Sequence, residues 1–255
     1  MTPKHWLALA GLATASLAHA AVVGTARPSD AAASAAITIS DTPPPQAVSK
    51  SDRETIVEAR SLIQDGQPQE AITRVLDPFI AALEARYRDQ PGVLYCANSQ
   101  AEALFYLVKE STQQHAATVL DGAWCDAYFM RGFAQFDLGR LDLAEADYAR
   151  ALALEPENPH VLSEMGDMHL RHKDWPGAIT YFEHAIEATK TFGAEERKTA
   201  ETTRALRGVG YADVELGRLE DAEARYARCL EIDPHDEKAR AELAYVKDLR
   251  AKRGG

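Results

Sequence analysis

One phrase occurs twice in this chain, and this near-repeat constrains the fold more than any other feature of the sequence. Residues 138–156 read LGRLDLAEADYARALALEP and residues 216–234 read LGRLEDAEARYARCLEIDP, and the two agree at most positions. A third copy lies between them, because Gly132, Gly166 and Gly210 stand at matching places in successive copies. The separation between Gly166 and Gly210 in the sequence is ten residues longer than the separation between Gly132 and Gly166. Self-similarity at a period of roughly 20 to 50 residues is typical of a solenoid of stacked repeats.

The three copies carry the same types of residue in the same columns. The first helix of each copy offers a large apolar residue and then glycine, and the second offers alanine, an aromatic residue and a small residue. These columns are Tyr128, Leu162 and Leu206; Gly132, Gly166 and Gly210; Ala144, Ala178 and Ala222; Tyr148, Phe182 and Tyr226; and Ala151, Ala185 and Cys229. Gly and Ala allow two antiparallel helices to approach closely, and the aromatic ring fills the remaining space.

The period and columns resemble the tetratricopeptide repeat over residues 125–236. The resemblance implies an all-α fold, a right-handed α-solenoid of antiparallel helix hairpins, with repeats at 125–158, 159–202 and 203–236. The ten extra residues, near 191–200, are expected to lengthen the next helix at its N-terminus after a break at Phe192-Gly193. Residues 237–255 have apolar residues on one side and many charges on the other, so we expect a capping helix and tail there.

Residues 51–124 are expected to continue the array as degenerate helical hairpins. The pattern predicts helices at 53–64 and 68–77, with Pro78 interrupting the second, and two further helices at 97–110 and 112–120.

Two departures from the repeat pattern concern single columns. Gln135, His169 and Asp213 stand where the pattern expects tyrosine, and Arg131 stands at a normally apolar position. Two interpretations of Arg131 remain open: an ion pair with Asp147 on the facing helix, or an arginine whose stem is buried while its charge reaches water.

The N-terminus has the three zones of a secretory signal peptide. Lys4 and His5 precede an apolar run at 6–17, and Ala18-His19-Ala20 follows, so cleavage after Ala20 and a periplasmic or secreted location are expected. The apolar run is too short for a membrane span. Residues 21–50, rich in Ala, Ser, Thr and Pro, are expected to form a disordered linker.

The net charge argues against two classes of partner, and the cysteines permit one disulfide. Cleavage would remove one lysine and no acidic residue, so the formal net charge of −11 becomes −12, which argues against binding to nucleic acid or an anionic membrane. An oxidising compartment permits a disulfide between Cys96 and Cys125, but spacing alone leaves this pairing open. Cys229 falls in a helical core column and is expected to be buried.

The sequence contains no phosphate-binding loop, nucleophile elbow or zinc-protease motif, so we expect neither catalysis nor a cofactor. The best alternative is a metal-binding or enzymatic accessory protein that uses His169 and His172, with Asp167 and His184 nearby. A second alternative is a structural module that associates with itself.

The leading hypothesis is an exported adaptor that binds a peptide or helical segment of another protein, in cell-envelope assembly, secretion or maturation as the resemblance implies. The resemblance also implies a concave groove lined by the first helices. Matching positions give an apolar end, an acidic middle and a basic end: Phe129, Met130, Phe133 and Phe136; Ser163, Glu164 and Asp167; Arg204, Arg207 and Tyr211. Three phenylalanines on one helix are more often core than binding residues, so a stripe that packs in the core is the other interpretation of Phe129, Phe133 and Phe136. Phe133, Asp167 and Tyr211 stand where a carboxylate clamp for chaperone C-termini would need asparagine. The oligomeric state is not predicted.

Overall fold

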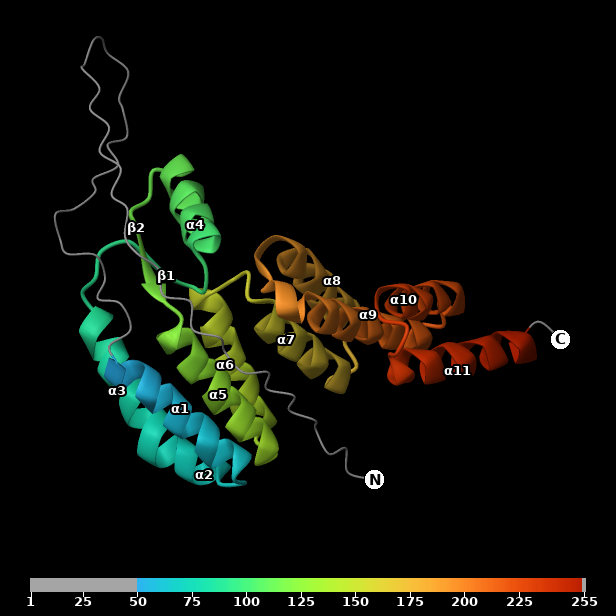
Figure 1. Ribbon diagram of the computed structural model, residues 1–255, viewed down its shortest axis with the longest axis horizontal. Helices are drawn as coiled ribbons and strands as arrows, with labels where there is room; N and C mark the ends of the chain where they lie inside the picture. Colours follow the sequence, from blue (N-terminus) through green and yellow to red (C-terminus); the bar gives the residue numbers. More distant parts are fainter. Residues whose placement is uncertain (1–49, 254–255) are drawn as a thin grey trace, which may run out of the picture. The chain divides into compact units, whose positions relative to one another are not determined.

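The computed structural model describes residues 50–253, so the predicted signal peptide, nearly all of the predicted linker and the last two residues lie outside the described residues. The described chain is mostly helical, and successive helices form hairpins that pack against the next hairpin along the chain (Figure 1). The predicted solenoid of helix hairpins is therefore the fold of most of this part of the chain. None of the helices within residues 50–253 combines the length and the apolar character that a membrane crossing requires.

Three hairpins occupy the repeated part of the sequence. They are α5 (Ala123–Asp137) with α6 (Leu141–Leu154), α7 (Pro159–Arg171) with α8 (Trp175–Phe192), and α9 (Lys198–Glu215) with α10 (Leu219–Ile232). A final helix, α11 (Glu237–Arg253), packs against α10 and completely buries Val246. Its other side is exposed and charged, as expected of a helix that ends a repeat array.

Two glycines show why the hairpins can pack so closely. The ring of Phe182 is buried between Gly166 and Gly208. A Cβ atom would lie 2.8 Å from this ring if added at Gly166 and 2.4 Å if added at Gly208, and both distances are too short for real contacts. The small column of one repeat therefore makes room for an aromatic ring that also contacts the next repeat.

In the turn between the two helices of each repeat hairpin, the residue at one matching position has a left-handed backbone conformation. Gly139 has φ +74° and Gly217 has φ +75°, whereas the middle repeat places Lys173 there with φ +58°. A non-glycine residue in this conformation is strained, so the middle turn is the least favourable of the three.

The ten extra residues between Gly166 and Gly210 are distributed differently from the prediction. α8 continues to Phe192, although the position matching the end of α6 is residue 188. The break falls at Gly193, as predicted, and is followed by a 3₁₀ turn, Glu195–Arg197. α9 then begins at Lys198, although the position matching the start of α7 is residue 203. The last turn of α8 buries Ala188 and Thr189 in addition to the residues of the usual columns, and the added turn of α9 buries Glu201.

The N-terminal hairpin is helical, but Pro78 does not end its second helix. α1 (Lys50–Gln64) packs against a continuous helical stretch made of α2 (Pro68–Glu70), a π-helical turn (Ala71–Leu76) and α3 (Asp77–Tyr87). Proline lacks the N–H that an α-helix interior needs. Here Pro78 lies in the first turn of α3, and the preceding turn has already changed to the wider π pattern, so the chain stays helical.

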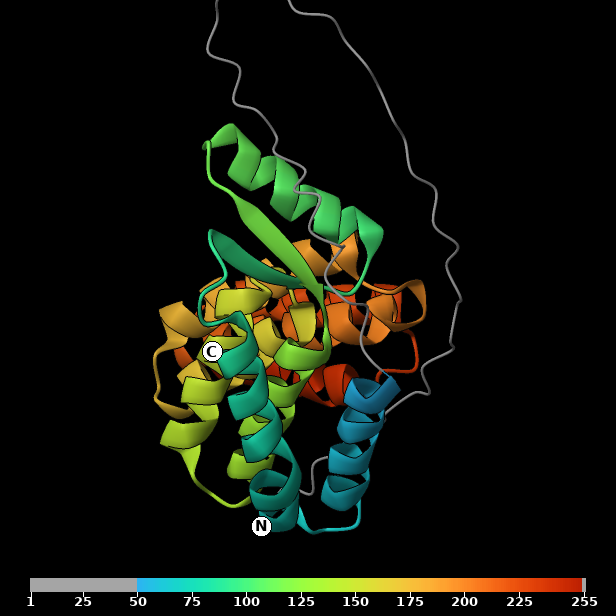
Figure 2. The ribbon, with the colours of Figure 1, turned by 90° about the vertical axis from the view of Figure 1, so that its left-hand side faces the viewer.

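The helix predicted at 97–110 is present as Gln100–Thr112, but it does not belong to a helical hairpin, and the prediction of hairpins through residue 124 is wrong for residues 93–97 and 117–121, which are strands. Residues 93–121 form a β-α-β unit: strand β1 (Val93–Ala97), helix α4 (Gln100–Thr112) and strand β2 (Ala117–Asp121), with β1 and β2 parallel. The helix expected at 112–120 is thus mainly a strand. A left-handed Gln114, φ +59°, stops α4 and turns the chain back to pair with β1. Tyr95 of β1 stacks on Tyr106 of α4, while Cys96 points to the repeats, so α4 lies along one face of the strand pair (Figure 2).

A disulfide joins this unit to the first repeat. Cys96 of β1 is bonded to Cys125 of α5, and both are buried, which resolves the pairing that the sequence left open. Cys229 is a free, buried thiol, as its column predicts.

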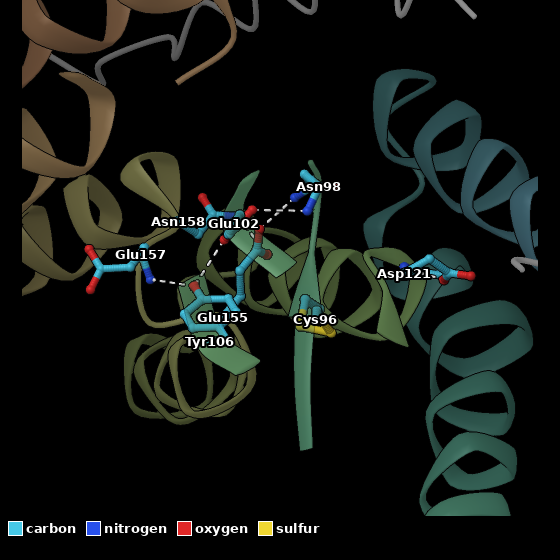
Figure 3. The surroundings of a disulfide bond; sticks show 10 residues. Cys96, Asn98, Glu102, Tyr106, Asp121, Glu155, Glu157 and Asn158 are labelled. Carbon is cyan, nitrogen blue, oxygen red and sulfur yellow. Dashed lines mark hydrogen bonds between the residues drawn. A yellow bond between two sulfur atoms is a disulfide. The ribbon is translucent and has the colours of Figure 1, made fainter. Parts of the chain in front are cut away.

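A network of polar side chains, in which Glu102, Tyr106 and Glu155 are buried, surrounds the same junction (Figure 3). Asn98 donates to Glu155 Oε1 at 2.5 Å, and Asn158 donates to Glu155 Oε2 at 2.9 Å. Tyr106 donates to Glu102 Oε1 at 2.9 Å and accepts from the backbone N–H of Glu157 at 3.1 Å. Burial raises the pKa of both carboxyl groups, that of Glu155 to about 8. The unit is therefore tied to the α6–α7 connection by a network that contains two buried acids.

Candidate functional site

The nine residues predicted to bind a partner lie on α5, α7 and α9, the first helices of the three repeats. Two contacts place these helices side by side. The ring of Phe129 meets the ring of His160 at 5.0 Å between centroids, and Arg204 Nη2 lies 2.8 Å from Glu164 Oε1. We call the side of α5, α7 and α9 that carries these residues the first-helix surface.

The apolar end of this surface is largely used for packing. Met130 is buried, so it offers no side chain to a partner. Phe129, Phe133 and Phe136 are partly buried and pack against the core shared by α1, α3 and α5 to α7. The guanidinium of Arg171 covers the ring of Phe136 at 4.5 Å. Of the two interpretations of this stripe, packing therefore accounts for most of its contacts.

The acidic and basic residues of the surface are paired with each other. Arg204 lies between Glu164 and Asp167, with Nη2 2.8 Å and 2.7 Å from their carboxylate oxygens. Arg207 pairs with Asp236, whose side chain is buried at the start of α11. Ser163 is completely buried and donates to the carbonyl of Pro159. Arg204 thus joins the third repeat to the second, and Arg207 joins α9 to the residue that precedes α11.

Three residues around this surface, Asp126, His160 and Glu201, were missed at the level of sequence. Asp126 and His160 occupy the same column as Arg204 in the three copies, and only Arg204 was selected. His160 Nδ1 lies 3.1 Å from Glu201 Oε1, and Glu201 belongs to the added turn of α9. Burial acts to raise the pKa of Glu201, but the hydrogen bond and charge of His160 bring it below its usual value. Burial raises the pKa of Asp126 to about 6. The column was visible in the sequence, whereas the contact of Glu201 depends on the path of the insertion.

The accessible part of the first-helix surface lies nearer the C-terminal ends of its helices. The side chain of Asp167 is 40% exposed although one oxygen contacts Arg204. Tyr211 is 45% exposed, and its ring meets the partly buried Trp175 edge-on at 6.2 Å between centroids. Asp167 and Tyr211 are the predicted residues best placed to contact another molecule.

A separate hollow of about 390 Å³ lies between α3, α5 and α6. Its lining combines both signs of charge with one exposed apolar side chain: Asp77, Glu84, Tyr128, Arg131, Gln135, Leu143, Ala146, Asp147 and Arg150. Arg131 bonds Asp147 through two nitrogens at 2.9 Å and 2.7 Å and also contacts Asp77 at 2.9 Å. The ion-pair interpretation of Arg131 is therefore correct, and this arginine joins the N-terminal hairpin to the first repeat.

The histidines of the alternative metal site do not converge. Each contacts a different carboxylate: His169 with Asp174 at 2.7 Å, His172 with Glu145 at 3.7 Å, and His184 with Glu157 at 3.0 Å. Within residues 50–253 there is no cluster of three or more potential metal ligands. The geometry thus provides no support for the alternative function.

Comparisons with known proteins agree with this architecture. Residues 129–194 match the model of the tetratricopeptide repeat. No curated protein matches the chain at a significant level. Among solved structures, PilF of Pseudomonas aeruginosa is 14% identical, with 79% of this chain and 69% of that chain covered and a TM-score of 0.54. MamA from Desulfovibrio magneticus RS-1 is 15% identical, with 80% and 88% covered and a TM-score of 0.52.

These two structures are similar in fold over most of the chain, and the sequence match covers the α5–α8 hairpins that contain the repeated columns. Residues 129–194 therefore match the tetratricopeptide repeat in sequence, and the fold of most of the chain is similar to that of these two solved structures.

Proposed function

We propose that this protein is a non-catalytic adaptor that binds a segment of another protein across its first-helix surface. The observation that carries the proposal is the pair of accessible side chains on neighbouring helices, Tyr211 on α9 and Asp167 on α7. Exposed aromatic residues beside a charged group are typical anchors of protein interfaces. The partner would supply an apolar side chain against Tyr211 and Trp175 and a donor to the free oxygen of Asp167.

The internal ion pairs refine which residues should be tested. Arg207 is bound to the buried Asp236, so replacing it would leave a buried carboxylate without its partner and disturb α11. Tyr211 has no such role, and Leu143 on α6 provides a control outside the first-helix surface, because it is an exposed apolar residue of a second helix, 52% exposed compared with 45% for Tyr211.

The first prediction concerns capture of the partner from cells of the source organism, separated into envelope and soluble fractions. We expect the parent and Leu143→Glu to retain the same protein, and Tyr211→Glu to retain at least tenfold less of it, because a charge would replace the apolar anchor. Binding is measured by quantitative mass spectrometry after circular dichroism shows equal helicity. Equal retention by Tyr211→Glu and the parent would contradict the role of this surface.

Export and a role in the cell envelope are the second part of the proposal. Two observations support it: the signal-peptide zones before Ala21 and the Cys96–Cys125 disulfide, since such bonds persist mainly in oxidising compartments. We expect N-terminal sequencing of the protein from its own cells to give a chain that begins at Ala21 in the exported fraction. A chain that keeps Met1 and fractionates with the cytoplasm would contradict export.

A further inference from the structure

The β-α-β unit contains a parallel sheet with only two strands, β1 and β2. Parallel strands normally lie inside larger sheets, where both edges are paired. The N–H of Val93 bonds the carbonyl of Ala116, and Val93 is opposite Ala117, so alternate residues of β2 point to β1. The backbone groups of Ala117 and Val119 therefore point away from β1. Within residues 50–253 no backbone group pairs with them.

The outer edge of β2 also lacks the features that usually protect an edge strand. Exposed edges in monomeric proteins are blunted by charged residues, proline or bulges. Within β2, residues 117–120 have none of these, and the charged residue of the strand, Asp121, is its last and accepts a hydrogen bond from the N–H of Ala123. Thr118 and Val119 are residues that favour strands. An edge of this kind is suited to pairing with another strand.

Helix α4 turns an apolar face away from the sheet. Glu102, Tyr106 and Glu110 face inward and are buried. The opposite side carries four large hydrophobic residues that are exposed: Leu104, Phe105, Leu107 and Val108. A surface helix normally shows the reverse arrangement, with its apolar side in the core. The outward face of α4 is thus a second feature that lacks a partner within the described chain.

The open edge and part of this apolar face lie on the same side of the unit. Parallel strands are joined by right-handed crossovers, which places the flank of α4 bearing Leu104 and Leu107 above β2. The opposite flank must then face the repeats. It does so, because the ring of Phe105 meets the ring of Phe192 of α8 at 5.1 Å between centroids.

We propose that this side of the β-α-β unit binds a second copy of the same chain. A two-fold axis beside β2 would pair the two β2 strands antiparallel, with Val119 opposite the same residue of the second copy, and would form one four-stranded sheet. Both copies of α4 then lie on the same face of this sheet, and their Leu104 and Leu107 flanks meet. A single two-fold axis thus buries both the open edge of β2 and the apolar flank of α4. The surface is self-complementary, as a two-fold interface requires.

Charge favours a second copy over an oppositely charged partner. The flank of α4 that faces the axis consists of Gln100, Ala103, Leu104, Leu107 and Ser111 and has no charge, while Lys109 lies on the other flank. The chain has a formal net charge of −11, so the contact between two copies is least unfavourable where no like charges face each other. The contact is independent of the first-helix surface.

The strength of the dimer follows from its size. One short strand pair and one helix flank bury less than the roughly 1,600 Å² of a typical stable interface, so we expect dissociation in the micromolar range. Sedimentation equilibrium of the full gene product, as the producing cell processes it, is expected to show a reversible monomer–dimer exchange between about 1 and 100 µM.

Three variants locate the interface. Leu104→Glu introduces a charge on the flank and is expected to raise the dissociation constant at least tenfold. Ala117→Pro removes an outward N–H from the first residue of an edge strand, where proline is tolerated, and is expected to have a similar effect. Val57→Glu on α1 is the control, because Val57 and Leu104 are 62% and 61% exposed, and should dimerise like the parent. Circular dichroism and titration of free thiols confirm that each variant is folded with its disulfide formed.

Hydrogen exchange distinguishes a second copy from other occupants of the edge. The amide of Val119 is expected to become protected as the protein concentration rises through the dimer range. A parent chain that stays monomeric at the top of the range, about 100 µM, overturns the proposal, whether Val119 exchanges freely or is protected by another part of the chain. A dimer that Leu104→Glu and Ala117→Pro leave unchanged overturns it too, since association would then use another surface.

Discussion

Replacing Cys96 and Cys125 together with alanine is expected to destabilise the N-terminal half of the protein by about 3 to 4 kcal/mol. The bond closes a loop with a sequence separation of 29 residues, and removing it returns the entropy of that loop to the unfolded chain. Without the bond, the β-α-β unit is held to the repeats only by non-covalent contacts: the polar network around Glu155, the packing of Leu94 and Leu120 in the core, and the contact of Phe105 with Phe192. We therefore expect this unit to detach before the repeats unfold.

Hydrogen exchange followed by mass spectrometry measures where the stability is lost. Protection should fall in β1, α4 and β2 and remain in α9, α10 and α11, because stability in repeat arrays is local. Reductant provides the control: it should destabilise the parent to the level of the double variant and leave the double variant unchanged. An equal loss of protection in α10 would contradict a local role of the bond.

Glu155→Gln is expected to remove a pH dependence of about 2 to 3 kcal/mol between pH 6 and pH 9. Burial, and then the charge of Glu102, raise the pKa of Glu155 to about 8 in the folded chain, compared with an ordinary value of 4.5. Between these values the folded chain binds more protons at this site than the unfolded chain does. The stability from this group is therefore complete below pH 4.5 and falls as the pH rises through 8.

Urea unfolding at pH 6 and pH 9 tests this prediction. The parent should lose more stability at pH 9 than Glu155→Gln does, because ionised Glu155 is buried beside Glu102 and Asp126. Glutamine keeps an acceptor for Asn158, so the variant should remain folded. Glu187→Gln, at an exposed position of α8, should behave like the parent. An identical pH dependence of the parent and Glu155→Gln would show that Glu155 does not titrate in this range.

The repeat hairpins could be predicted from sequence because the residues that make their contacts recur at matching positions in each repeat. Phe182 lies between Gly166 and Gly208 in the sequence as well as in space, and a close helix approach requires a small residue wherever a ring is present. The same pattern identified the break at Gly193. It could not show that α8 would lengthen, because that depends on the burial of Ala188 and Thr189 by neighbouring helices.

The β-α-β unit could not be predicted from local pattern. Residues 112–120 have an acceptable helix start, and their apolar residues are too few to distinguish a short helix from a short strand. Pairing of β2 with β1, which is distant in sequence, decides the structure. The sequence also could not show that α4 exposes its apolar side.

The sequence placed the residues of the candidate site on the correct helices, but it did not show that their charged side chains form ion pairs with each other. Arg204, Glu164 and Asp167 were each placed on the first-helix surface, yet their mutual ion pairs depend on how far α9 lies from α7. Tyr211 was selected from the same columns and is exposed. Whether these residues bind a partner stays a prediction.

The contact between Phe105 and Phe192 has a consequence for how the array unfolds. In a simple repeat protein each unit interacts only with its immediate neighbours, so the ends can fray one unit at a time. Here the lengthened α8 of the second repeat touches a unit that precedes the first repeat. If the first repeat unfolded alone, it would form a loop whose two ends are held by these neighbours, so the entropy that it gains would be smaller. The lengthened helix therefore makes the central part of the chain more cooperative than a linear array, so a change in the number of repeats would alter more than the length of the solenoid.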